Sequence, residues 1–202
     1  VGQSLPDIAN PIEAEDLEFG VHVAPGTWRQ LALRAPKVAG GYADVKLLPP
    51  LWWLRENDAE VGQTVFISVP ECGIDGHAEV LAIDPCPSVA SEGSIVTGKF
   101  VHHDARVLDL YIEGQPDPIG TTPNHPFWSE DRQQFVRADE LTVGETLRTL
   151  DGGLAHVGAI TPRSGLHSVY NIEVQGSHIY HVGEDGVLVH NGNGVCPIRN
   201  QH

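Results

Sequence analysis

The sequence predicts an all-β fold, and three observations support that prediction. Twenty-two glycines and 15 prolines divide the 202 residues into short segments. Most of these segments place apolar residues at alternate positions, which is the period of a half-buried strand. The 3.6-residue period of an amphipathic helix is nearly absent. We therefore expect many short strands joined by tight turns, with at most short helices.

The first half is expected to contain four strands and one short helix. Gly40 and Gly41 mark a turn between two alternating segments. Pro49 and Pro50 precede a segment that contains paired tryptophans, and a short helix is expected there. In chain order the elements are strands at 28–33 and 42–48, a helix that ends near 58, and strands at 63–69 and 77–84.

The second half is expected to fold as hairpins. Asp151-Gly152-Gly153 is a strong turn signal between two alternating segments. Residues 94–102 and 107–112 are expected to pair as one long hairpin. The other elements are a strand at 134–136, a helical turn at 138–141, and strands at 145–150, 154–161, 169–174, 178–182 and 187–190.

The last strand ends in a chemically distinctive pair, His190-Asn191, followed by Gly192. An asparagine carboxamide can attack its own carbonyl carbon, which closes a five-membered succinimide and breaks the next peptide bond. A neighbouring histidine can protonate the leaving amine, because its ordinary pKa lies near neutrality. Glycine after the asparagine leaves room for ring closure. Taken alone, an Asn-Gly pair after a strand is more often a simple turn.

Three motifs precede that pair along the chain, and a fourth contains it. They are TTPNHPFW at 121–128, which contains a Thr-x-x-His, FVRADEL at 135–141, VYNIEV at 169–174 and VGEDGVLVHN at 182–191. This ordered set resembles the Hint superfamily of hedgehog autoprocessing domains and inteins. The greatest similarity is to the pretoxin Hint domains of bacterial polymorphic toxins. The resemblance is strong from about Val96 to Asn191 and weaker before it.

The resemblance implies a horseshoe of two pseudo-symmetric β halves. Residues 15–23 and 139–147 share an acid-acid-Leu-x-apolar-Gly pattern, which suggests an internal repeat of the kind such halves would leave. Residues 1–191 would form the autoprocessing domain, and residues 192–202 would begin a flanking cargo segment. The stretch from about 45 to 92 is longer than a minimal Hint core needs, so we expect a β-rich insertion that decorates one end.

The resemblance also implies roles for the site residues. Thr122 and His125 would serve an N-terminal scissile junction, and His125 is either a remnant of that reaction or a support for the C-terminal one. His178 would polarise the Asn191 carbonyl or activate its side-chain amide. His190 would protonate the nitrogen of Gly192.

Two departures from the splicing pattern narrow the expected activity. No cysteine precedes Cys72, so the usual N-terminal nucleophile is absent, replaced, or lost with sequence upstream of Val1, and sterol transfer is disfavoured. Gly192 offers no side-chain nucleophile and Cys196 comes four residues too late, so splicing is disfavoured as well. The remaining activity is self-cleavage after Asn191, which would release the following segment, a toxin in pretoxin proteins. The alternative is a Hint-derived scaffold that presents the downstream domain without cutting it.

Composition excludes several other classes of function. The net charge of −15 argues against nucleic-acid binding, and there is no run of about 18 apolar residues that could span a membrane.

The histidine spacing and the cysteines give no clear metal site or disulfide. In a strand His178 and His181 would point to opposite faces, so we expect no metal site and no cofactor, although a zinc hydrolase stays open as a third class of function. A Cys72–Cys86 disulfide is compatible with the sequence but not indicated by it. We expect a monomer within a larger secreted or cell-surface bacterial precursor, whose substrate is its own C-terminal segment.

Overall fold

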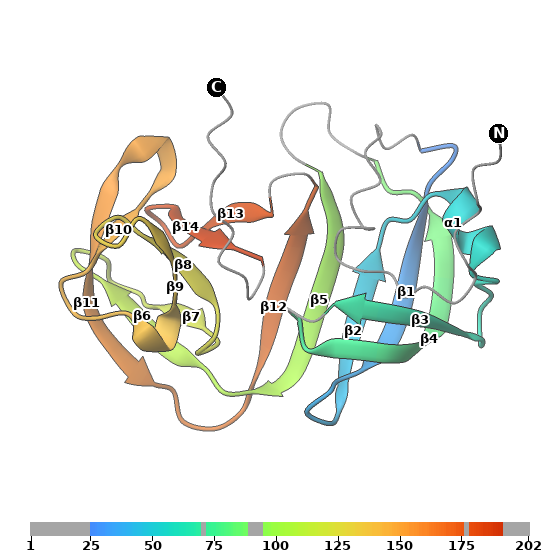
Figure 1. Cartoon of the computed structure of the whole chain (residues 1–202), viewed down its shortest axis with the longest axis horizontal. Coiled ribbons are helices and arrows are strands. Elements are labelled where there is room, and N and C mark those ends of the chain that lie inside the picture. The colour runs from blue at the N-terminus through green and yellow to red at the C-terminus, as the bar shows by residue number, and fades with distance from the viewer. Residues whose placement is uncertain (1–24, 70–71, 89–94, 176–177, 192–202) are drawn as a thin grey trace, which may run out of the picture. The chain divides into compact units, whose positions relative to one another are not determined.

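The chain is built almost entirely from β-strands, which confirms the predicted all-β fold (Figure 1). The computed structural model describes residues 25–69, 72–88, 95–175 and 178–191. Fourteen strands, one α-helix and short 3-10 turns make up its regular structure within these ranges. No helix of the described ranges is long and apolar enough to cross a membrane.

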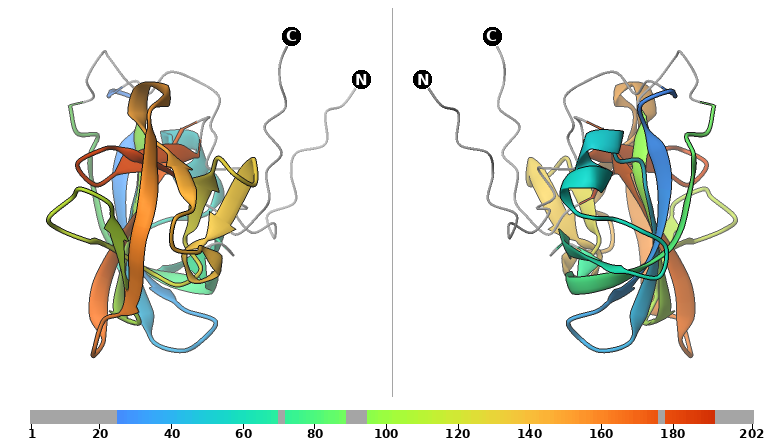
Figure 2. Two further views of the ribbon diagram at one scale, coloured as in Figure 1. Left: turned by 90° about the vertical axis from the view of Figure 1, so that its left-hand side faces the viewer. Right: turned by 90° about the vertical axis from the view of Figure 1, so that its right-hand side faces the viewer.

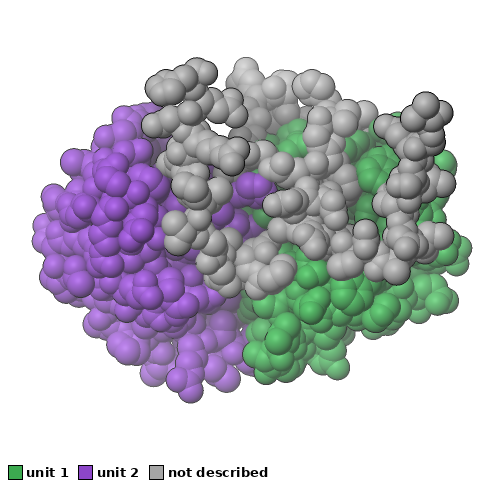
Figure 3. All heavy atoms as spheres, in the orientation of Figure 1, with its two compact units in different colours: residues 1–102, 170–176 green, residues 103–169, 177–202 purple. Residues whose placement is uncertain are grey.

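Two compact units divide the chain (Figure 3). Unit 1 comprises residues 1–102 and 170–176, and unit 2 comprises residues 103–169 and 177–202. Unit 1 is centred on a six-stranded antiparallel sheet with the order β12-β5-β2-β1-β4-β3. Its strands are β1 (Arg29–Pro36), β2 (Tyr42–Leu47), β3 (Thr64–Val69), β4 (Ile74–Pro85), β5 (Val96–Ala105) and β12 (His167–Val174).

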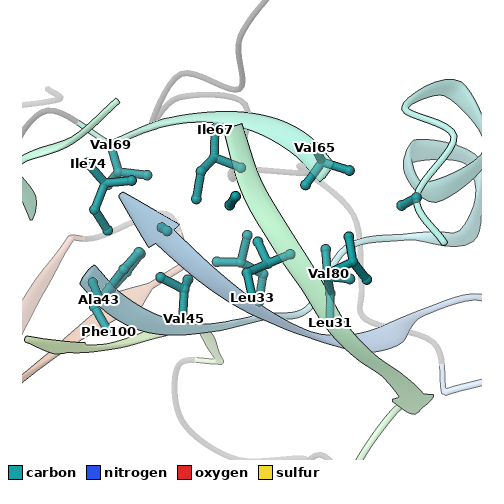
Figure 4. Packing of buried hydrophobic residues seen from close by; sticks show 14 of the residues in the cluster. Leu31, Leu33, Ala43, Val45, Val65, Ile67, Val69, Ile74, Val80 and Phe100 are labelled. Atoms are coloured by element: carbon teal, nitrogen blue, oxygen red, sulfur yellow. The ribbon is translucent and has the colours of Figure 1, made fainter. Parts of the chain in front are cut away.

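The core of unit 1 follows directly from the alternating pattern of its strands (Figure 4). Every second residue of β1, β2 and β3 is buried, because successive side chains of a strand point to opposite faces. The helix α1 (Leu51–Glu56) adds Trp53 to this core, whereas Trp52 stays half exposed. Among the buried residues that form the cluster are Leu31, Leu33, Val45, Val65, Ile67, Ile74, Val80 and Phe100.

The stretch expected to decorate one end, about residues 45–92, contributes strands to the sheet of unit 1. It supplies β3 and most of β4, and β4 pairs with β1 from Arg29↔Pro85 to Arg34↔Glu79. The apolar side chains of β3 and β4 belong to the same buried cluster as Leu31 and Leu33. Their alternation placed them correctly as strands. The status of this stretch as an insertion stays a prediction.

Unit 2 contains an eight-stranded sheet with the order β13-β14-β8-β10-β11-β6-β7, with β9 paired to β8 off that path. The long strand β11 joins two ladders, because its first residues pair with β10 and its later ones with β6 (Figure 2). The strands are β6 (Leu108–Ile112), β7 (Ile119–Thr121), β8 (Pro126–Ser129), β9 (Gln134–Arg137), β10 (Thr146–Arg148), β11 (Leu154–Pro162), β13 (Ile179–Val182) and β14 (Val187–His190).

One expected hairpin forms and another does not. The strands β10 and β11 pair around Asp151 and Gly152, whose φ angles of 57° and 77° satisfy the tight turn. The expected hairpin of 94–102 with 107–112 is wrong, because β5 pairs with β2 and β12 whereas β6 pairs with β7 and β11. The short link between β5 and β6 contains no glycine, and the chain runs on into the second sheet.

Two further expectations from the sequence concern a disulfide and an internal repeat. Cys72 and Cys86 are both thiols, so the disulfide that the sequence left open is not formed. The first copy of the proposed internal repeat, residues 15–23, lies outside the described residues. The second copy, residues 139–147, overlaps the 3-10 turn Ala138–Glu140, which agrees with the helical turn expected at 138–141.

Candidate functional site

Three neighbouring strands of unit 2, β13, β14 and β8, carry the predicted site residues at one end. The antiparallel registers pair Ile179 with His190 and Val189 with Phe127. Extending each register by one or two residues places Asn191 opposite His178 on one side and opposite His125 on the other. A hydrogen bond supports the first extension, since the Asn191 N–H donates to the His178 carbonyl at 2.7 Å.

The two faces of these strands have different surroundings. Phe127 and Val189 are fully buried in the core of unit 2, and Tyr180 packs against that core from β13. On the other face Trp128, Phe135 and Leu188 form a separate small cluster, with Ile179 against it. Strand alternation therefore directs Asn191 towards the side of Val189 and His190 towards the side of Leu188.

Asn191 is the most enclosed of the predicted site residues. Its relative exposure is only 4%, although it directly follows the last residue of β14. Its N–H is held by the His178 carbonyl, so both its backbone and its surroundings restrict its orientation. The other residue of the expected scissile bond, Gly192, lies outside the described residues.

His178 and His190 lie close together on the side of the small cluster. Their ring centroids are 6.2 Å apart, and the Phe135 ring lies 4.9 Å from that of His190. His178 has a φ of 52°, in the left-handed region that non-glycine residues seldom adopt. The strand expected from His178 therefore begins at Ile179, and the alternation argument that separated His178 from His181 does not apply.

His125 occupies the opposite face, immediately before β8. The Tyr180 hydroxyl oxygen lies 3.4 Å from its Nε2, and the Phe127 ring meets it edge-on with centroids 5.7 Å apart. Burial lowers the pKa of His125 from 6.5 to about 4, and the charge of His190 lowers it too. His125 is therefore neutral at pH 7, and it can accept or donate a hydrogen bond without carrying a charge.

Thr122 contributes to the position of His125 through its backbone. The His125 N–H donates to the Thr122 carbonyl at 3.1 Å and closes the turn that leads into β8. A second tie comes from the Ala138 N–H, which donates to the His125 carbonyl at 2.9 Å. The structure thus assigns Thr122 a place in the turn, while its predicted role at an N-terminal junction stays a prediction.

The structure brings His125, His178, His190 and Asn191 together at one end of three strands in unit 2. Sequence reasoning did not single out Tyr180 or Phe135 as part of this site. Tyr180 could have been found from its alternation with Val182 on a strand next to the site, whereas Phe135 reaches His190 only through the pairing of β9 with β8. Within the described ranges, no group of three or more His, Cys, Asp or Glu residues is arranged to hold a metal ion.

A comparison with known protein families agrees with the sequence motifs. The family model of the pretoxin HINT domain matches residues 73–192. The bacterial intein-like domain from Clostridium thermocellum is 27% identical, covers 80% of this chain and 97% of its own, and gives a TM-score of 0.44. The Msm DnaB1 intein splicing domain bound with zinc is 15% identical, covers 79% and 98%, and gives 0.42. The gp41-1 intein is 15% identical, covers 82% and 98%, and gives 0.41. No curated protein sequence matches the chain.

Proposed function

Because this chain belongs to the pretoxin HINT domain family, and is therefore a Hint-type self-processing domain, we propose that it breaks its own Asn191–Gly192 bond by asparagine cyclisation. The observation that carries the proposal is the position of Asn191. It is buried directly after β14, and its N–H donates to the His178 carbonyl. Extending the Val189↔Phe127 register by two residues places it opposite His125 on the other side.

The proposed reaction balances without any added reagent. The side-chain Nδ2 of Asn191 attacks the backbone carbonyl carbon of the same residue and loses a proton. The bond from that carbon to the nitrogen of Gly192 breaks, and this nitrogen takes up a proton as it leaves as an amine. One product ends in a C-terminal succinimide, and the other begins at Gly192 with a new amino group. Water opens the succinimide afterwards.

Two histidines are suited to the proton transfers of this reaction. His190 adjoins the scissile bond, and we assign it the proton donated to the Gly192 nitrogen. His178 is bound to Asn191 through its carbonyl, and we assign it the polarisation of the scissile carbonyl or the activation of the amide. A well-placed acid or base typically contributes about 10²–10⁴-fold to a rate.

His125 is assigned to the same reaction, as a neutral hydrogen-bonding group. Its register position next to Asn191 and its pKa of about 4 favour this role over that of a remnant of the N-terminal reaction. A group with so low a pKa is a poor proton donor at pH 7, since almost none of it is protonated. Orienting the Asn191 carboxamide needs no proton from it.

The product of this reaction determines the biological role that we propose. Cleavage without splicing separates the segment after Asn191 from the domain, and we propose that this segment is a toxin or similar cargo. The substrate is then the chain's own flanking segment, and the domain acts as a monomer within a larger secreted or cell-surface bacterial precursor. The alternative stays a scaffold that presents the downstream domain uncut.

The mass of the purified chain, followed over time, distinguishes self-cleavage from the uncut scaffold. Cleavage predicts that the full-length mass declines and that fragments 1–191 and 192–202 appear together. An Asn191→Ala variant should keep its full-length mass, since alanine lacks the attacking amide. Cutting of Asn191→Ala at the same bond and rate would assign the cleavage to an outside protease. A parent chain that stays intact indefinitely would support the scaffold.

A further inference from the structure

We propose that an aromatic stack of Trp128 and Phe135 positions the His190 imidazole for proton transfer, and that Glu130 and Arg148 hold this stack from outside. The inference rests on the proposed function, because it concerns how His190 reaches the leaving nitrogen. We call Trp128, Phe135, Glu130 and Arg148 the positioning stack. None of the four is placed at the reacting atoms, so each would act through His190.

The inner part of the stack is a run of three rings. Trp128 and Phe135 meet edge-to-face, with centroids 5.1 Å apart and planes at 77°. Phe135 in turn lies against His190, with centroids 4.9 Å apart and planes at 56°. Trp128 and Phe135 are both less than one-tenth exposed, so their side chains present a fixed surface to the imidazole. Such ring pairs favour particular orientations, which a flexible aliphatic neighbour does not impose.

The outer part of the stack fixes the indole of Trp128. The Trp128 Nε1–H donates to Glu130 Oε2 at 2.8 Å. Arg148 donates two hydrogen bonds to the same carboxylate, from Nε at 3.0 Å and from Nη2 at 2.8 Å. Its guanidinium lies 5.2 Å from the Trp128 ring centroid. Hydrogen bonds from Arg148 and Trp128 lower the pKa of Glu130 to about 2. The carboxylate therefore stays ionised throughout the pH range of any cleavage assay.

This arrangement matters because His190 is on a different face of the strand from Asn191. Because its side chain points away from that of Asn191, His190 must hold one restricted orientation to reach the nitrogen of Gly192. Fixing its ring in advance removes part of the entropy cost of reaching the reactive geometry. Small errors in the position of a catalytic group cost large factors in rate. We therefore expect loss of the Phe135 ring to slow cleavage by about tenfold or more.

The first experiment compares three variants of the full chain by the rate of fragment appearance. Phe135→Leu keeps an apolar side chain but removes the ring, and should be about tenfold slower than the parent. Phe135→Tyr keeps the ring and should restore most of the rate. Phe66→Leu is the matched control, because it removes a similar contact in unit 1, where the Phe66 and His77 rings lie 5.3 Å apart. It should cleave at the parent rate.

The second experiment reads the His190 ring directly by NMR. In an Asn191→Ala background, which keeps the chain whole, the imidazole protons of His190 should carry a ring-current shift from Phe135. Phe135→Leu should remove that shift, and Arg148→Met, at a partly buried position, should alter it without changing the histidine itself. Arg148→Met also keeps the test open if Phe135→Leu does not fold.

The outcomes separate this inference from the proposed function. A parent chain that is never cleaved overturns the proposed function, and with it any role of the stack in cleavage. A parent chain that is cleaved while folded Phe135→Leu is cleaved equally fast overturns only the positioning role. Unchanged His190 resonances in both Phe135→Leu and Arg148→Met would overturn the stack as a determinant of the ring's orientation.

Discussion

At the scale of single residues, ring size makes Asn191 irreplaceable for the proposed reaction. Asn191→Gln keeps the carboxamide but requires a six-membered glutarimide, with one more rotatable bond to fix. We expect this variant to cleave at least about a hundredfold more slowly than the parent, since the attacking group is both farther from the carbonyl and less restricted. Fragment masses followed over days measure it. Cleavage of Asn191→Gln at the parent rate would contradict a cyclisation mechanism.

A second prediction at this scale concerns how His125 makes folding stability depend on pH. Its folded pKa of about 4 lies below its ordinary 6.5, so between these values the unfolded chain binds more protons at this residue than the folded one. Folding stability should therefore fall as the pH drops from about 6.5 to about 4, by at most about 3 kcal/mol from this residue. The remaining exposure of the ring to solvent reduces that figure.

His125→Asn removes this titration and isolates its contribution. Urea unfolding of the parent and the variant, both carrying Asn191→Ala to prevent cleavage, gives the free energy of unfolding at each pH. The parent should lose more stability than His125→Asn between pH 7 and pH 4, and the difference should be roughly 1–3 kcal/mol. Equal losses in the two chains would show that His125 is not held neutral by its surroundings.

The sequence predicts the residues whose chemistry is local and misses those that reach the site across strands. His190 and Asn191 are adjacent, and their reaction needs only each other and Gly192. Phe135 lies more than 50 positions earlier, and no residue pattern connects it with His190 until β9 and β14 are both paired with β8. The left-handed backbone of His178 is equally hidden, because it depends on the strand pairing around it.

At the scale of elements, Glu145 ties together the segments on either side of β9. Its relative exposure is 4%, and its carboxylate accepts hydrogen bonds from Ser129 Oγ at 2.6 Å and from Arg132 Nη2 at 2.8 Å. The backbone and hydroxyl of Thr142 donate to it at 2.9 Å and 3.1 Å. The end of β8, the turn after it and the approach to β10 therefore share one acceptor.

Neutralising this acceptor should weaken unit 2. Glu145→Gln keeps the size of the side chain but removes the charge and places an NH₂ group among donors, so we expect a loss of about 1–3 kcal/mol in the free energy of unfolding. Urea unfolding measures it, with Glu184→Gln as an exposed control that should change stability by less than about 0.5 kcal/mol. A Glu145→Gln variant as stable as the parent would show that the buried charge contributes nothing.

The same carboxylate makes a pH-dependent contribution to stability. Burial raises the pKa of Glu145, but hydrogen bonds from Ser129 and Thr142 and the attraction of Arg132 outweigh it, so the net pKa is below its ordinary value. The stabilisation is present above the ordinary carboxyl pKa and is lost as the pH falls through the lower folded value. Glu145→Gln should therefore show a smaller loss of stability on acidification than the parent.

Elements were predictable from the sequence to the extent that they depend on alternation and turn residues. The β10–β11 hairpin was predicted because Asp151 and Gly152 supply the left-handed backbone that the turn needs. The partners of β5 and β6 were not, because alternation defines which face of a strand is buried and says nothing about its neighbour. Short strands without a glycine turn between them leave that choice to tertiary packing.

At the scale of the whole chain, the residues that match the family model do not include all the strands of the two sheets. The matched residues begin at 73, yet β4, which starts at Ile74, is held between β1 and β3 in the sheet of unit 1. The strands β1, β2 and β3, which precede the match, therefore contribute to the sheet and to the buried core of unit 1. The predicted site belongs entirely to unit 2, and all its described residues lie within the match.

The last prediction concerns what the domain releases. Every group that we assign to the reaction precedes the scissile bond or is the backbone of Gly192, and nothing in the proposed mechanism recognises the residues that follow. A folded reporter protein fused after His202 should therefore be freed at the same rate as residues 192–202 alone, with a new N-terminus at Gly192. N-terminal sequencing of the freed reporter and its appearance over time measure this. A matched fusion carrying Asn191→Ala should stay whole, which separates self-cleavage from proteolysis of the exposed linker. If the parent fusion stays attached while the chain without a reporter is cut, then the downstream residues take part in forming the site, and release would depend on the identity of the cargo.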